Sequence, residues 1–291
     1  MRVLRTVIGG ETVSRAGLGR TEAGLARRAG ILRAVPRPPS ARMDPSFFHR
    51  APYFGENADF VAWGVSHVAV LVVSVLGYGG LVAWVRRQPE DVQQRVGTVV
   101  GAVPVVVWAS FNLFRLAIGD WTKHVDIPLN LCPLVSFVLP LVLGPRRSTR
   151  VFEAVYFFAL VGCMQALITP NLFEEAPHYM FWRYWLLHVS IIGAVAYALA
   201  VYRMRPTWAG LTRAYVALVA YVGVAKGLNT LLGTNYAFTQ RKLDTASVLD
   251  ALGPYPVYIF QALGVGLALF VLIYLPVTVG GHLARRRAAA G

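Results

Sequence analysis

The chain has 291 residues, of which 56% are hydrophobic and only 14% are charged, and its mean hydropathy is +0.53. Because a soluble domain carries about 25% charged residues, this composition indicates a protein that is embedded in a lipid bilayer. The formal net charge of +14 lies in the N-terminal segment and in short clusters between apolar runs, so it does not predict nucleic-acid binding. With two cysteines the chain has neither a disulfide framework nor a CxxC metal or redox site.

Residues 1–42 are rich in Arg, Gly, Ala and Pro, and we predict that this extension is disordered. It holds nine arginines against two glutamates, a composition that is also typical of a transit peptide. An alternative is that translation starts at Met43 and that the extension is an over-extended reading frame. No apolar core of sufficient length follows the first arginines, which argues against a cleaved secretory signal.

Residues 43–283 form the predicted membrane domain, which contains seven apolar runs. Each is near the ~20 residues that a helix needs to cross a bilayer. The third is short and flanked by prolines, which favours a tilted, re-entrant or broken helix. Backbone groups in lipid must be paired internally, so we predict an all-α membrane protein with seven transmembrane helices. The runs are 64–85, 96–118, 128–144, 151–170, 179–202, 208–232 and 255–280.

The loop charges predict the orientation. Basic clusters follow runs one, three, five and seven, whereas the opposite loops contain most of the acidic residues. By the positive-inside rule the N-terminus is outside, the C-terminus is cytoplasmic, and residues 284–291 are a basic cytoplasmic tail. The arginines of residues 1–42 conflict with this topology unless that segment is not translated. We expect an integral protein of a bacterial-type plasma membrane. The clusters are Arg86, Arg87 and Arg95; Arg146, Arg147 and Arg150; Arg203 and Arg205; and Arg285, Arg286 and Arg287.

This topology places most intramembrane polar residues in the outer half of the bilayer. Glu153, at the start of run four, is the main polar residue of the inner half, and Asp126 is expected to be a solvated loop charge. Burying a polar group is costly unless it is partnered, so such clustering indicates a site or a pathway. The outer group contains His67, Arg115, Asn130, Cys132, Gln165, Thr169, His188, Lys226 and Asn229, with Asn235 and Tyr236 just outside.

The residue types suggest thiol chemistry, with Cys132 as nucleophile and His188 as its base. A neighbouring imidazole activates a thiol, and a thioester intermediate divides an acyl transfer into two easier steps. The amides Asn130, Asn229 or Asn235 could orient the histidine or bind an oxyanion. The cations Arg115 or Lys226 could hold a lipid phosphate. Substrate-binding or orienting roles are also predicted for Gln165, Tyr236 and His67.

Each of these residues also has a purely structural interpretation. Cys132 could be a small buried apolar side chain, and His188 could be a hydrogen-bonded contact between helices. Arg115 and Lys226 could extend to the outer interface, and His67 could be an interfacial residue. Cys132 and Cys163 could form a disulfide. No HxxxH or HExxH spacing supports a metal site, and we predict neither a metal nor a cofactor.

Several short segments occur in an order and spacing that are distinctive together. The chain resembles the YwaF-like and transmembrane protein 164 family of integral membrane proteins over roughly residues 43–278. The resemblance implies a seven-helix fold. The segments that carry it are residues 128–132 (PLNLC), 152–153 (FE), 165–170 (QALITP), 187–188 (LH), Asn229, 233–236 (GTNY) and 252–256 (LGPYP).

For the animal branch of that family, the resemblance implies an acyltransferase that moves fatty acyl chains between phospholipids through a cysteine acyl intermediate. The matching residues here are Cys132 and His188. The sequence departs from the bacterial pattern at Asn130, where a histidine is common, and from the animal branch at Pro133, which replaces a histidine. A more distant resemblance is to the androgen-induced-protein family of membrane lipid hydrolases, which uses a threonine and a histidine.

Two alternative functions remain beside a phospholipid acyltransferase. One is a membrane-embedded lipid hydrolase, and the other is a non-enzymatic binder or transporter of a small molecule or lipid. The predicted partners are membrane lipids, with no nucleic acid and no predicted oligomeric state.

Overall fold

The computed structural model describes residues 6–8, 11–13, 60–117, 119, 121–172, 174–242 and 248–290, which belong to two compact units, 1–43 and 44–291. In the first unit, β1 (Thr6–Ile8) pairs antiparallel with β2 (Glu11–Val13), with Thr6 opposite Val13. The rest of the N-terminal extension lies outside the described residues, so its predicted disorder stays a prediction.

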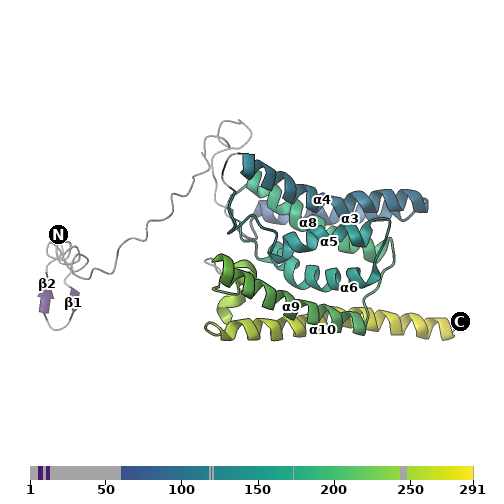
Figure 1. The fold of residues 1–291 in the computed structure, drawn as a ribbon. Coiled ribbons are helices and arrows are strands. Elements are labelled where there is room, and N and C mark those ends of the chain that lie inside the picture. Colours follow the sequence, from purple (N-terminus) through teal and green to yellow (C-terminus); the bar gives the residue numbers. More distant parts are fainter. Residues whose placement is uncertain are drawn as a thin grey trace. The chain divides into compact units, whose positions relative to one another are not determined.

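The second unit is helical throughout its described residues, and each of the seven apolar runs contains a helix (Figure 1). Run four is composite, because a π-helix separates two short α-helices. The two short 3₁₀ turns, η2 (Tyr236–Phe238) and η3 (Val248–Ala251), lie in the connection before the last helix. The helices are α3 (Val65–Val85), α4 (Glu90–Ala117), α5 (Leu131–Leu143), α6 (Thr149–Phe158), the π-helix η1 (Ala159–Cys163), α7 (Met164–Ile168), α8 (Tyr179–Ala200), α9 (Trp208–Leu232) and α10 (Val257–Ala290).

Six helical segments within the described residues are long and apolar enough to cross a bilayer. They are α3, α4, the composite helix Thr149–Ile168, α8, α9 and α10. The exception is α5, whose 13 residues span only about 20 Å at 1.5 Å per residue, against ~30 Å of hydrocarbon. The structure therefore confirms an all-helical membrane fold with six candidate spans.

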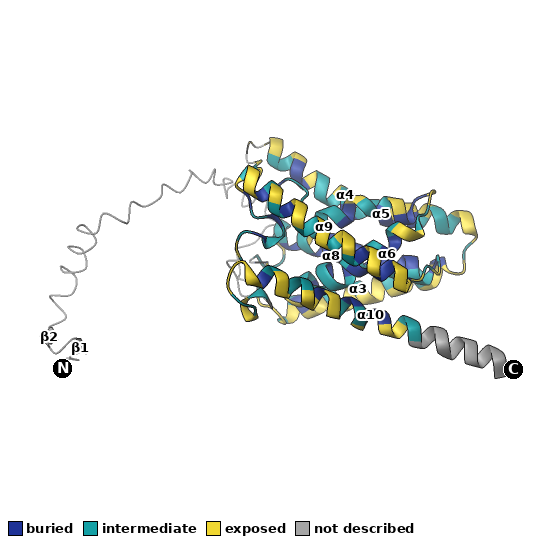
Figure 2. Cartoon of the chain, turned by 60° about the horizontal axis from the view of Figure 1, so that its bottom comes forward, coloured by how far each residue is buried: buried dark blue, intermediate teal, exposed yellow. Residues whose placement is uncertain are grey.

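The core lies where α4, α5, α6 and α8 pack together, with α3 against α8 and α10 against α9 on the outside. Leu139, Phe157, Ile191 and Tyr197 are fully buried there. Outward faces carry exposed aliphatic side chains, as in Val72–Leu76 of α3, and Figure 2 shows the buried residues concentrated between the helices. An apolar surface of this extent needs a bilayer to cover it.

Glu153 joins the starts of α6 and α9. Its buried carboxylate forms an ion pair with Arg213 at 2.5 Å and accepts hydrogen bonds from the amide and hydroxyl of Thr207, the N-cap of α9. A Cβ at Gly210 would lie 2.3 Å from Cδ of Glu153, so a glycine is needed for this close approach. The inner-half carboxylate predicted from the sequence is therefore a packing contact between two helices.

Candidate functional site

Cys132 lies in the first turn of α5. The N-cap residue Asn130 is extended and does not cap the helix, because its Oδ1 instead accepts a hydrogen bond from the amide of Ala237 at 3.1 Å. Pro133 lacks an N–H, which suits the first turn of a helix. Among the described residues, the amides of Leu131 and Cys132 have no hydrogen-bond partner. The thiol therefore lies beside two unpaired N–H donors at the positive end of a helix.

The Cys132 side chain lies near two other side chains, Cys163 and His188, close enough to interact with them electrostatically. Cys163 is the last residue of the π-helix η1, and His188 lies near the middle of α8. Cys163 is fully buried and His188 is 8% exposed, whereas Cys132 is only partly buried. Both cysteines are free thiols that lie near each other, without the disulfide that was one sequence-based alternative.

The hydrogen bond of His188 determines which ring nitrogen carries the proton. Nδ1 lies 2.8 Å from the carbonyl oxygen of Tyr184. A carbonyl oxygen can only accept, so Nδ1 must be the donor, and in the neutral ring Nε2 carries the lone pair. The ring of Tyr184 lies 4.3 Å from that of His188, and its hydroxyl donates to the carbonyl of Ala166 at 2.7 Å. The imidazole is therefore held in the tautomer that can accept a proton.

A second tyrosine lies near both thiols. Tyr221 projects from α9, and its hydroxyl donates to the carbonyl of Leu129 at 2.7 Å, just before α5 begins. Four elements, α5, η1, α8 and α9, therefore surround the thiol of Cys132. A π-helix is rare and often marks a functional site, because it adds a residue to one turn and shifts the side chains that follow.

Asp126 is buried, and the prediction that it is a solvated loop charge is wrong. Its carboxylate forms an ion pair with Arg115, whose Nε lies 2.8 Å from Oδ1, and it also accepts from the amide of Thr122 at 2.8 Å. The side chain of Asp126 is only 1% exposed. The pair fixes the connection between α4 and α5, so the guanidinium predicted to hold a lipid phosphate is already paired.

Asn229 also has a structural role. Its Nδ2 donates to the carbonyl of Tyr236 and to Oγ1 of Thr239, and its Oδ1 accepts from Oγ1 of Thr234 and from the amide of Tyr236. These four bonds use the full capacity of a carboxamide. Asn229 therefore shapes the turn after α9.

Lys226, Asn235 and Tyr236 stabilise the same connection. Lys226 Nζ lies 2.6 Å from both Oε1 of Gln240 and the hydroxyl of Tyr255, and Oδ1 of Asn235 accepts from the amide of Gln240 at 3.0 Å. The Tyr236 hydroxyl donates to the carbonyl of Lys123 and accepts from the amide of Ile127, so it joins the α9–α10 connection to the α4–α5 connection. Burial raises the pKa of Tyr236 above its ordinary value.

His67 and Gln165 lie apart from these contacts. His67 is fully buried; its Nδ1 accepts from the amide of Trp63 at 2.8 Å and its Nε2 lies 2.9 Å from the carbonyl of Leu167. Both ring nitrogens are thus occupied. Gln165, in α7, contributes its backbone carbonyl, which accepts from the amide and hydroxyl of Thr169. Of the predicted site residues, Cys132 and His188 lie near each other, and their roles stay predictions.

Cys163 and Arg183 were not predicted as site residues. Cys163 was considered only as a disulfide partner, although its depth in run four matched that of Cys132. Arg183 lies near the start of α8, where its guanidinium is 3.7 Å from the ring centroid of Phe111 and its buried Nε has no hydrogen-bond partner among the described residues. The residue types alone could not show these contacts, because they depend on how distant helices pack.

The fold defines a helical membrane protein with six candidate spans in its described residues. The sequence profile of the TMEM164 family matches residues 62–274, and the chain therefore belongs to the TMEM164 family. This confirms the resemblance found in the sequence. Comparisons with curated proteins and with solved structures find no match.

Proposed function

We propose that this protein is a membrane acyltransferase that moves a fatty acyl chain between phospholipids, with Cys132 as nucleophile and His188 as general base. The observation that supports the proposal is the proximity of Cys132 to His188, together with the hydrogen bond from Nδ1 of His188 to the carbonyl of Tyr184. That bond leaves Nε2 to take the thiol proton. A base held by a third group is the usual arrangement of an activated nucleophile.

The transfer divides into two steps that conserve atoms and protons. In the first, Nε2 of His188 takes the proton of the Cys132 thiol, and the sulfur attacks the carbonyl carbon of a phospholipid ester. The C–O bond breaks, and the leaving lysolipid alkoxide takes the proton from His188. In the second step, His188 takes a proton from the hydroxyl of an acceptor lipid, whose oxygen attacks the thioester and regenerates the thiol.

The start of α5 supplies electrostatic support for both steps. The amides of Leu131 and Cys132 are unpaired in the described structure, and we expect them to donate to the negative oxygen that forms next to the sulfur. Such donors stabilise the tetrahedral intermediate, and the helix N-terminus also favours a thiolate. Arg183 replaces Arg115 and Lys226 as the cation that we expect to face the donor's phosphate, because both of those have protein partners.

We also propose that the chain crosses the membrane seven times. Arg86, Arg147 and Arg203 lie in the connections after α3, α5 and α8, and all three line one cleft. These connections therefore share one end of the bundle, which supports a crossing by α5 despite its length. The positive-inside rule makes that end cytoplasmic, with the C-terminus inside and Met43 outside. Cys132 then lies in the outer half of a bacterial-type plasma membrane.

The two alternatives differ in how they use the same residues. In a lipid hydrolase, water replaces the acceptor hydroxyl in the second step and the first step is unchanged. A non-enzymatic binder or transporter would need polar side chains with unused hydrogen-bonding capacity. Asn229, His67 and the Arg115–Asp126 pair use theirs on protein groups, which supports the enzyme instead.

Acyl labelling of the purified protein tests the proposal. A phospholipid with an alkyne-tagged acyl chain is expected to label the unchanged protein at a bond that neutral hydroxylamine cleaves, as expected of a thioester. Cys132→Ala and Cys132→Ser are expected to abolish the label. His188→Gln should slow labelling by about 10²–10⁴-fold, the usual contribution of a general base.

Cys163→Ala is the matched control, since it removes the other cysteine and leaves the thiol of Cys132. Because Cys163 is fully buried, we expect the label to remain in this variant. Labelling that persists after Cys132→Ala would contradict the thiol mechanism, provided that expression and thermal unfolding are unchanged.

A further inference from the structure

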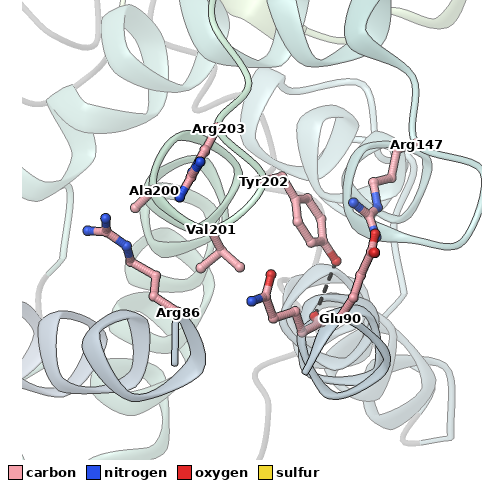
Figure 3. Close-up of a pocket in the computed structure, with 8 residues that line it drawn as sticks. Arg86, Glu90, Arg147, Ala200, Val201, Tyr202 and Arg203 are labelled. Carbon is pink, nitrogen blue, oxygen red and sulfur yellow. Dashed lines mark hydrogen bonds and ion pairs between the residues drawn. The ribbon is translucent and has the colours of Figure 1, made fainter. Parts of the chain in front are cut away.

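A cleft of about 350 Å³ lies at the end of the bundle that carries the basic connections (Figure 3). Its walls come from the end of α3, the start of α4, the connection after α5 and the end of α8. Because α5 rises about 20 Å between its two ends, the cleft lies well away from Cys132. Its lining residues are Arg86, Glu90, Gln93, Arg147, Ala200, Val201, Tyr202 and Arg203.

One wall of the cleft is tightly constructed around Arg147. Its guanidinium stacks on the ring of Tyr202 at 3.9 Å, and its Nε donates to Oε1 of Gln94 at 2.8 Å. The Tyr202 hydroxyl lies 3.1 Å from the carbonyl of Leu143. A Cβ at residue 97 would lie 2.0 Å from that hydroxyl, so Gly97 is required for Tyr202 to pack here. Arg147 is thus held in a fixed orientation.

Glu90 is the acid that lines the cleft, and it neutralises Arg147 only in part. The two side chains form an ion pair at 3.8 Å, but the Glu90 side chain is 86% exposed. Exposed ion pairs are weak because water screens them. The lining therefore presents three guanidinium groups against one solvated carboxylate.

Arg86 and Arg203 differ from Arg147 because neither guanidinium has a hydrogen-bond or ion-pair partner among the described residues. Figure 3 shows both on the side of the cleft opposite Arg147 and Glu90. Arg203 also has a left-handed backbone, with φ of 55°. This conformation is unfavourable for a residue with a Cβ, and glycine or asparagine would fit more readily. The turn itself does not require an arginine at this position. The side chain of Arg203 instead places a positive charge at the cleft.

We propose that this cleft binds a phosphate group. Guanidinium groups bind phosphate through paired N–H donors, and Arg86 and Arg203 have theirs unused while Arg147 supplies a fixed positive charge. The positive-inside rule explains why arginines occur in these connections. It does not explain the cleft, the stacking on Tyr202 or the left-handed Arg203. The phosphate comes from a phospholipid headgroup or from a soluble phosphate ester, and the two sources share this chemistry.

The proposal can be tested with the full chain purified in a neutral detergent, by native mass spectrometry. Dioctanoyl phosphatidic acid is the lipid probe, and glycerol 3-phosphate is the soluble probe. The test variant is Arg86→Gln/Arg203→Asn, since asparagine tolerates a positive φ. The control is Arg87→Gln/Arg150→Gln, which removes two positive charges from the same end at exposed residues that do not line the cleft.

We expect the test variant to bind the phosphate probe at least about tenfold more weakly, which corresponds to the loss of one charge-assisted hydrogen bond or more. The control should bind within about twofold of the unchanged protein, since charges outside the cleft act only through a screened field. Binding of phosphatidic acid alone assigns the site to a lipid headgroup, and equal binding of glycerol 3-phosphate assigns it to a soluble ester. Equal losses in the two variants, or no binding of either probe to the unchanged protein, would overturn the proposal.

Discussion

The two ends of the bundle use their polar residues differently. At the end that carries Cys132, the charged and amide side chains are mostly paired with protein groups, as in Arg115 with Asp126 and in the four hydrogen bonds of Asn229. At the basic end, Arg86 and Arg203 line a cleft without a partner in the described structure. The first arrangement fixes the connections around a reactive side chain. The second arrangement leaves positively charged side chains available to bind a ligand.

The largest effect is expected when the buried ion pair near Cys132 is broken. Asp126→Asn leaves the charge of Arg115 without its partner, which should lower the free energy of unfolding by about 3–5 kcal/mol. Denaturant titration in detergent measures this. Glu90→Gln is the matched change at the basic end, and because Glu90 is 86% exposed it should cost roughly 1 kcal/mol or less. Similar losses in the two variants would contradict the proposed difference between the ends.

A smaller effect is expected at Tyr236, which joins two connections through its hydroxyl. Tyr236→Phe leaves the carbonyl of Lys123 and the amide of Ile127 without this partner and should cost about 1–2 kcal/mol near pH 8. Because burial raises the pKa of Tyr236, folding favours the protonated phenol. Its contribution is complete below the ordinary pKa of about 10 and is lost as the pH rises through the folded value.

The pH dependence gives that prediction an internal control. Unfolding free energies of the unchanged protein and of Tyr236→Phe should converge as the pH rises above about 10. A difference that stays constant across this range would show that the hydroxyl does not titrate with folding.

The smallest effect, and one of opposite sign, is expected at Arg203. Arg203→Gly should raise the unfolding free energy by roughly 0.5 kcal/mol, because relief of the left-handed backbone exceeds the added freedom of the unfolded chain. The same variant should lose phosphate binding. Thermal unfolding and the mass-spectrometric titration measure the two effects on one sample. A marked loss of stability would show that the side chain of Arg203 is needed for the fold.

The sequence predicted the helices well because long apolar runs are a strong signal. Run six, residues 208–232, matches α9 (Trp208–Leu232), and runs one and five lie within two residues of α3 and α8. Run three gave α5, whose 13 residues leave it outside the six candidate spans, and the sequence had already marked this run as short and flanked by prolines. The π-helix could not be predicted, because it produces no periodicity that a run of apolar residues would reveal. Run four was taken as one regular helix, and η1 interrupts that regular spacing.

The candidate site was predictable only as a set of residue types. Cys132 and His188 suggested a pair, but their contact depends on how α5 packs against α8. The burial of Asp126 was not predicted because the sequence of a loop does not indicate which of its residues are buried. Its partner Arg115 lies in the preceding helix. The cleft was missed because the arginines that line it had already been explained by topology.

The π-helix η1 also determines how α7 is rotated relative to α6 within one candidate span. A single extra residue in a helix turns everything that follows by about 100°. Deleting one residue from Ala159–Cys163 would rotate α7 relative to α6, which Glu153 holds against α9. The carbonyls of Ala166 and Leu167 would then face away from Tyr184 and His67. Chain length between Glu153 and Leu167 therefore determines which side chains α7 can bind.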